Sequence, residues 1–139
     1  MSDVIAIQFL YPDEPSRDWW VRLVRLFARP GETVELQCWR EEEAACALAG
    51  SLLPEESAPS WPYGRIFRGC AGEAALEAIL AAPGGEDGPT PFFTATFGGA
   101  LCSAHWGREI YILEPAQDGA AQAALLAEIP EEHASIGEC

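Results

Sequence analysis

The alternation of apolar and polar positions is most regular between Phe92 and Glu114, where it predicts three short antiparallel strands. Side chains along a strand point to opposite faces with a period of two, which is the spacing seen here. Two glycine-containing pairs, Gly98-Gly99 and Gly107-Arg108, interrupt the alternation. Because glycine supplies the positive φ that two-residue hairpins require, both pairs are predicted to be tight turns.

Two-residue turns would fix the register of these strands, since a slip of one residue exchanges the two faces. One face would then be a nearly continuous apolar surface of Phe93, Ala95, Phe97, Ala100, Cys102, Ala104, Trp106, Tyr111 and Leu113. The other face would carry Thr94, Thr96, Ser103 and His105 among Phe92, Leu101, Ile110 and Ile112. We expect helices from elsewhere in the chain to cover the apolar face.

The rest of the chain alternates predicted strands with predicted helices. The apolar run at 4–11 is typical of a central strand covered on both sides, and further strands are predicted at 33–39 and 64–69. Proline, glycine and capping residues delimit helices at 14–28, 41–53, 72–82 and 118–128. Because strand–helix–strand connections favour parallel neighbours, we expect parallel pairs beside the antiparallel meander.

These elements predict an α/β chain of the α+β kind. Its order is β-α-β-α-β-α, then a three-stranded antiparallel meander and a C-terminal helix, with a mixed sheet covered by helices on at least one face. The length of 139 residues suits one globular domain, 1–139. Segments 54–63 and 83–91, rich in proline and glycine, are predicted to be loop insertions, and 130–139 a loose tail.

The charge balance narrows the possible partners. Twenty-two acidic residues oppose eight basic ones, all arginine, for a net charge of −14. Nucleic acids and anionic membranes bind proteins largely through lysine and arginine, so neither is expected as a partner. A basic protein is expected instead, because complementary charge speeds encounter and selects partners.

Cysteine spacing and the absence of known motifs narrow the chemistry. Five cysteines without a CxxC pair indicate free thiols, and the first residues lack the basic and cleavage-site pattern of a signal peptide, so we expect a cytoplasmic protein. No apolar run has the length of a membrane span. Two histidines without ligand spacing predict no metal site, and no nucleotide or hydrolase fingerprint points to a cofactor.

Two groups of residues are candidate binding sites. The first is Trp61, Tyr63, Arg65 and Arg68, whose aromatic and arginine content is typical of an interaction hot spot. Alternatively, Trp61 folds back over the core. The second group is Ser103 and His105 with Thr94 and Thr96, which share a face in the predicted register and would border a pocket. Alternatively, His105 is an ordinary surface residue. Cys102 and His105 fall on opposite faces in that register, so they cannot form a catalytic pair.

Three hypotheses for function remain open. The first is a non-catalytic acidic interaction module, such as an inhibitor or immunity-type protein that neutralises a basic partner. The second is a small enzyme or ligand-binding protein with its site on the Ser103/His105 face. The third is a homodimeric structural subunit. The sequence favours the first, because charge and aromatic content support it while catalytic motifs are missing.

Overall fold

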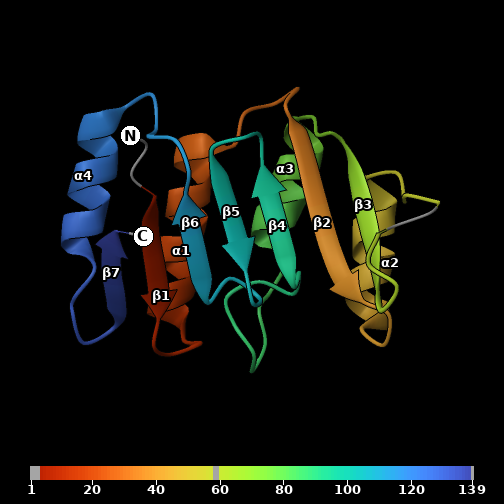
Figure 1. Ribbon diagram of the computed structural model, residues 1–139, viewed down its shortest axis with the longest axis horizontal. Helices are drawn as coiled ribbons and strands as arrows, with labels where there is room; N and C mark the ends of the chain where they lie inside the picture. The colour runs from red at the N-terminus through yellow and green to blue at the C-terminus, as the bar shows by residue number, and fades with distance from the viewer. Residues whose placement is uncertain (1–3, 58–59, 139) are drawn as a thin grey trace.

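The computed structural model describes residues 4–57 and 60–138 and has an α+β fold, as the sequence predicts (Figure 1). Its strands are β1 (Ile5–Phe9), β2 (Thr33–Trp39), β3 (Gly64–Cys70), β4 (Thr94–Phe97), β5 (Leu101–Ala104), β6 (Glu109–Ile112) and β7 (Ala134–Glu138). Its helices are α1 (Glu14–Phe27), α2 (Glu43–Leu52), α3 (Glu73–Ala81) and α4 (Gly119–Glu128). The predicted order of elements is confirmed through α4, and β7 is an addition.

Neighbouring strands of the sheet all run antiparallel, in the order β3-β2-β4-β5-β6-β1-β7. The described sheet therefore lacks the parallel pairs expected of the strand–helix–strand connections. β1 and β2 do point the same way, as Figure 1 shows, but the meander β4-β5-β6 lies between them. The connection through α1 sets their relative direction, whereas adjacency depends on pairing with strands that come much later in the chain.

β2 and β3 are neighbours that run antiparallel although α2 connects them. After α2, residues 54–56 follow the outer edge of β3, where Arg68 N donates to Pro54 O (2.9 Å) and Glu56 N donates to Ile66 O (2.8 Å). This segment carries the chain back along the sheet before β3 begins. The described residues of segments 54–63 and 83–91 contain no helix, and residues 58–59 of the first segment lie outside the described part.

The helices form one layer behind the sheet, and the front of the sheet is uncovered (Figure 1). α4 lies at the β7 end of this layer and packs against α1. The core between the two layers contains the largest fully buried side chains, which include Phe9, Trp20, Phe67, Phe92 and Phe97. We call the uncovered side the open face (Figure 1).

The predicted register of the meander is wrong by one residue between β4 and β5 and by two residues between β5 and β6. Phe97 lies opposite Leu101, so the first turn has three residues, and Ala104 lies opposite Glu109, so the second has four. Ser103 consequently points into the core, as do Leu101, Ile110 and Ile112, whereas Cys102, Ala104 and Tyr111 lie on the open face. The predicted core position of Cys102 is therefore also wrong.

The first and last strands differ from their predicted environments. β1 lies second from the edge and has one covered face, because Ile7 and Phe9 are buried while Gln8 is exposed. The tail expected to be loose forms β7, which pairs with β1 from Ile5↔Glu138 to Phe9↔Ala134. Residue 139 lies outside the described part. Backbone pairing with β1 orders a segment whose side chains alone give little indication of a strand.

α1 shows how local signals place a helix correctly. The Asp13 side chain accepts a hydrogen bond from Ser16 N at 3.0 Å, which caps the first turn. The buried stripe of the helix faces the sheet and contains Trp19, Trp20, Leu23, Val24 and Phe27. No helix in the described residues is long and apolar enough to cross a membrane.

Candidate functional site

Five rings gather where the open face meets the β5–β6 turn, and we call them the aromatic cluster: Trp39, Trp61, Phe93, His105 and Trp106. Phe93 is central, with ring centroids at 4.7 Å (Trp106), 5.1 Å (Trp39), 5.6 Å (His105) and 5.8 Å (Trp61). Most contacts are edge to face, which aromatic quadrupoles favour. Every member is partly exposed, so the cluster is a surface feature.

The tryptophans of the cluster come from separate segments of the chain. Trp39 ends β2, Trp61 precedes β3, and Trp106 belongs to the turn after β5. A Cβ at position 64 would collide with the ring of Trp61, so Gly64 allows the indole to lie directly on β3. Close approach of this kind fixes the ring against the sheet, because the backbone beneath it is held by the strand ladder.

The turn from His105 to Arg108 has an uncommon backbone. The φ angles are 50° at His105, 57° at Trp106 and 84° at Gly107. A left-handed conformation costs roughly 1–2 kcal/mol for residues other than glycine. Tertiary hydrogen bonds offset this cost, because Trp106 N donates to Phe93 O (3.0 Å) and Trp106 O accepts from Thr90 N (3.1 Å). The fold thus holds the Trp106 ring in place at some local strain.

An acidic cavity of about 360 Å³ opens beside the cluster, with Trp106 in one wall. Its carboxylates come from the start of α2 and from the 83–91 loop: Glu42, Glu43 and Asp87. Glu42 joins the cavity to the cluster, since it accepts hydrogen bonds from Trp106 Nε1 (2.9 Å) and Trp39 N (3.3 Å). No arginine lines this cavity among the described residues, so its charge is uncompensated locally.

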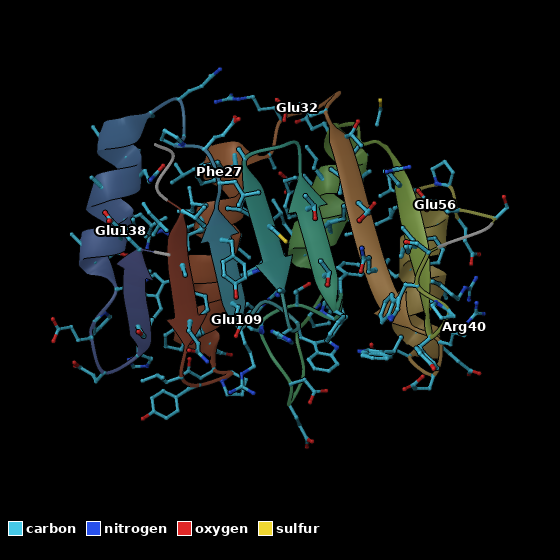
Figure 2. All side chains as sticks on the ribbon, in the orientation of Figure 1. Phe27, Glu32, Arg40, Glu56, Glu109 and Glu138 are labelled. Atoms are coloured by element: carbon cyan, nitrogen blue, oxygen red, sulfur yellow. The ribbon has the colours of Figure 1, made fainter. Side chains whose placement is uncertain are left out.

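A polar network lies on the other side of the same turn. The Glu109 carboxylate is 2.8 Å from His105 Nδ1 and accepts a hydrogen bond from Tyr111 at 2.9 Å. Partial burial raises the pKa of Glu109, but these two hydrogen bonds outweigh it and hold the pKa below its ordinary value. A shallow cavity of about 290 Å³ adjoins them, lined also by Gln8 and Arg108. Figure 2 labels Glu109 near the turn end of the open face.

The aromatic cluster unites one residue from each group predicted from the sequence. Trp61 and His105 both contact Phe93, although the sequence assigned them to different candidate sites. Trp61 covers other rings on the open face and does not cover the core. Tyr63 is 69% exposed in the segment just before β3. One residue of each predicted group thus belongs to the same surface, the aromatic cluster.

The predicted arginines do not share that surface. Arg65 points to the helix side of β3, where it makes two hydrogen bonds to Glu55 (2.7 and 2.8 Å) and lies 5.3 Å from the Phe67 ring. Arg68 points to the open face and pairs with Glu56 (2.7 Å) and, more distantly, with Glu35. Each guanidinium is already engaged by neighbouring carboxylates, so neither is available as a hot-spot residue.

The predicted pocket on the Ser103/His105 face does not exist as expected. Ser103 is fully buried and accepts a hydrogen bond from Trp20 Nε1 at 2.9 Å, while His105 lies in the turn. Thr94 and Thr96 do lie on the open face, half-buried, and Thr96 Oγ1 is 3.8 Å from Cys102 Sγ. The corrected register separates Ser103 from Thr94, Thr96 and His105, because it exchanges the two faces of β5 and points Ser103 into the core.

Sequence reasoning missed the centre of the site and its acidic partners. Phe93 was assigned to the covered face, and Glu42, Glu109 and Tyr111 were not singled out. A usable signal was present: Glu41-Glu42-Glu43 directly follows the strand that ends at Trp39, so carboxylates had to lie near that ring. The contact with Trp106 had no such signal, since it depends on the turn conformation.

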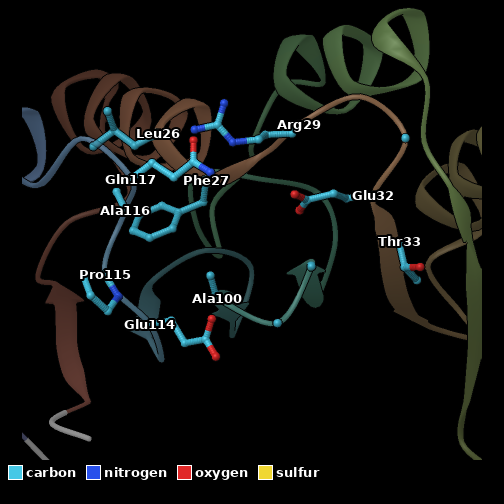
Figure 3. Close-up of a pocket in the computed structure, with 13 residues that line it drawn as sticks. Leu26, Phe27, Arg29, Glu32, Thr33, Ala100, Glu114, Pro115, Ala116 and Gln117 are labelled. Atoms are coloured by element: carbon cyan, nitrogen blue, oxygen red, sulfur yellow. The ribbon is translucent and has the colours of Figure 1, made fainter.

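A larger cavity, about 590 Å³, lies where the opposite ends of the strands meet the helix layer (Figure 3). Its rim carries charges of both signs, from Arg29, Glu32 and Glu114, and the aromatic ring in its lining, Phe27, is buried. It therefore lacks an exposed aromatic anchor. The described residues also contain no group of three or more side chains suited to hold a metal ion.

No family model matches this chain, and no curated protein or solved structure matches it significantly. Fold and site together define a class: a two-layer α+β protein with an uncovered antiparallel sheet face that ends in an aromatic cluster beside an acidic cavity. The function must be argued from that surface.

Proposed function

We propose that this chain is a non-catalytic interaction module that binds a basic protein through the aromatic cluster and the adjoining acidic cavity. The observation that carries the proposal is the contact between the two parts: Trp106 belongs to the cluster and donates to Glu42 in the cavity at 2.9 Å. A partner that covers the rings must therefore also meet the carboxylates.

The composition of this surface supports a protein partner. Binding energy at protein interfaces concentrates in a few central aromatic residues that are surrounded by polar contacts. The cluster supplies three half-exposed tryptophans, and Glu43 and Asp87 supply charge at its border. The rings fill the space between one another at 4.7–5.8 Å. A flat protein surface suits such a patch better than a small ligand, which needs a hollow.

The charge of the surface supports a basic partner. The chain carries −14 overall, and the cavity beside Trp106 has carboxylates without arginine in its described lining. If the partner normally binds phosphate groups, the carboxylates of this chain would occupy its phosphate-binding site, as expected for an inhibitor or immunity-type protein. We further propose that the protein acts in the cytoplasm, because Cys38, Cys46, Cys70 and Cys102 are free thiols.

A second candidate is a small-ligand or acid–base site at the β5–β6 turn. It is favoured by the 2.8 Å contact of His105 Nδ1 with Glu109, which orients the imidazole and leaves Nε2 for a ligand. The adjoining cavity is shallow, about 290 Å³, and lined in part by exposed side chains. Substrates usually occupy more enclosed sites, so this function ranks second.

Calorimetric titration with a poly-arginine peptide and with a basic nuclease tests the first proposal. We expect binding that weakens from low to physiological ionic strength, because salt screens exposed charges. The double variant Glu43→Gln/Asp87→Asn should bind about tenfold more weakly or worse, since each interfacial charge pair contributes on the order of 1 kcal/mol or more. Trp61→Ala should weaken binding without changing the salt dependence.

The matched control is Glu73→Gln/Glu114→Gln. Glu73 lies in the first turn of α3 as Glu43 lies in that of α2, and Glu114 is an exposed loop acid like Asp87. Both double variants remove two charges, so they differ only in location. Equal affinities in the two variants, or binding that is indifferent to salt, would contradict the proposed site. Loss of binding in Glu109→Gln alone would instead favour the second candidate, because Glu109 contacts His105 at the β5–β6 turn and belongs to neither the aromatic cluster nor the acidic cavity.

A further inference from the structure

The two edge strands of the sheet, β3 and β7, are covered to different extents. Along β3, residues 54–56 cover the outer edge, and ion pairs from Arg65 and Arg68 hold that segment in place. Along β7, the described chain places no strand outside Ala134–Glu138. Proteins usually protect an edge with charges, proline, a bulge or a covering segment. β7 has the single charge of Glu138, and its residues 135–138 are exposed, while α4 flanks this end of the sheet (Figure 1).

The alternation of backbone hydrogen bonds along β7 shows which of its N–H and C=O groups point away from β1. Leu10 N donates to His133 O at 2.8 Å, in the same register as the β1–β7 pairing. Residues in an antiparallel ladder alternate between facing their partner strand and facing away from it. Counting from His133, Ile136 and Glu138 direct their N–H and C=O groups outward. The edge therefore offers backbone donors and acceptors to another strand.

We propose that β7 pairs antiparallel with β7 of a second copy of this chain. The register that overlaps the whole strand places Ile136 opposite Ile136 of the second copy. Glu138 then lies opposite Ala134, and Ser135 opposite Gly137, so no like charges face each other across the interface. The outward groups of Ile136 meet their own counterparts, as the twofold symmetry of a closed dimer requires.

Exposed apolar side chains lie on β7 and on the segment that follows its neighbour β1. Ile136 is 39% exposed, Leu10 45% and Tyr11 52%, and together they make up three of the five most exposed large apolar side chains described. Leu10 and Tyr11 follow β1 directly, and the Tyr11 ring lies 5.6 Å from the ring of His133. Self-pairing would bring the two Ile136 side chains together and remove apolar surface from water.

The high negative charge gives this dimer a distinctive dependence on salt. Two chains of −14 repel each other, and Glu131, Glu132 and Glu138 are exposed close to the proposed interface. Added salt screens that repulsion, so dimerisation should strengthen from low to physiological ionic strength. Binding to a basic protein should weaken over the same range. The two proposals are independent, and their opposite responses to salt distinguish failure of one from failure of the other.

Self-pairing would also change what the open face can do. A twofold axis perpendicular to the sheet keeps both open faces on the same side of one continuous sheet. The dimer would thus present two aromatic clusters in the same direction. A partner with two basic sites could then be held at both, which raises the overall affinity without any new contact at either cluster.

Sedimentation and light scattering over a range of protein concentration and salt test the proposal. The wild-type chain should show twice its 15.0 kDa mass, with the dimer favoured by salt. Ile136→Pro should be a folded monomer, because it removes an outward N–H that β1 does not use. Ile136→Lys should also be monomeric, since it places two cations opposite each other. Ile136→Val is the matched control and should remain dimeric.

Two results would overturn the proposal. One is a wild-type mass of 15.0 kDa at every concentration and salt level. The other is a dimer that persists in Ile136→Pro, which would place the interface elsewhere. A wild-type monomer that binds an added extended peptide, with binding lost in Ile136→Pro, would likewise overturn self-pairing and assign the edge to strand addition by a different partner. Circular dichroism of each variant confirms that it is folded.

Discussion

Trp20 Nε1 donates a hydrogen bond to Ser103 Oγ at 2.9 Å in the middle of the core, which joins α1 to β5 across the interface between helix layer and sheet. Both side chains are fully buried. A buried donor that finds no acceptor loses its hydration without compensation. The serine is therefore explained as the partner of an indole, and not as part of a site.

Replacing this serine should destabilise the protein without affecting binding at the open face. Ser103→Ala leaves the Trp20 N–H unpaired, at a cost of about 1–3 kcal/mol in the free energy of unfolding. Chemical denaturation measures this change. Ser135→Ala, at an exposed position on β7, is the control and should change stability by less than about 0.5 kcal/mol. Equal effects of the two substitutions would show that the buried bond contributes nothing.

The two turn glycines 107 and 99 should respond very differently to alanine. Gly107 has φ of 84°, and a Cβ there would lie 2.9 Å from Trp20 Nε1. Strain and collision together should cost Gly107→Ala on the order of 2–4 kcal/mol. Gly99 has an ordinary φ and open space around it, so Gly99→Ala should be nearly neutral. Thermal unfolding compares them, and a tolerated Gly107→Ala would contradict the turn geometry.

Gly64→Ala should release the Trp61 ring from the aromatic cluster. The added methyl group occupies the place of the indole, so Trp61 must move or β3 must shift. We expect loss of the near-ultraviolet dichroism that arises from the Trp39–Trp61 pair, whose ring centroids are 4.7 Å apart. Stability should fall by about 1–3 kcal/mol, as for other overpacked sites. A spectrum identical to that of wild type would place Trp61 elsewhere.

Stability should depend on pH through Glu109. Its pKa in the folded state is lowered, because hydrogen bonds from Tyr111 and His105 outweigh the effect of burial. The unfolded chain then binds this proton more readily, so the stabilisation is present above the ordinary value of 4.5 and is lost as pH falls through the lower folded value. Glu109→Gln should make the unfolding free energy less steep in that acid range. Unfolding curves measured at several pH values compare the slopes.

The helices and most strand limits could be predicted because their signals are local. Asp13 caps α1, Asp118 caps α4 through its bond to Ala121 N, and prolines end several elements. The same local chemistry failed at the meander turns. Their glycines suggested two-residue loops, but the loops have three and four residues. His105 and Trp106 also adopt left-handed conformations, which their residue types do not predict.

Only part of the candidate site could be predicted, because residue type identifies some of its members and tertiary structure places the others. Trp61 and His105 stand out by residue type, and both are partly exposed in the aromatic cluster. Their common neighbour Phe93 could not be found, because it lies just before β4, where the strand alternation does not hold: Ala95 and Phe97 are buried as predicted, whereas Phe93 is partly exposed in the cluster. β7 was missed as well, since its order comes from backbone bonds to a strand more than one hundred residues earlier.

The position of β1 has a consequence for how a newly made chain reaches this structure. β1 precedes every other described strand along the chain, yet both strands beside it, β6 and β7, come from the last third of the sequence. On the ribosome the apolar residues of β1 therefore have no neighbouring strand until β6 has emerged. Closing such long-range contacts is slow. The nascent chain therefore completes this sheet only after β7 has emerged, and a chain that stops before residue 134 would leave one edge of β1 exposed.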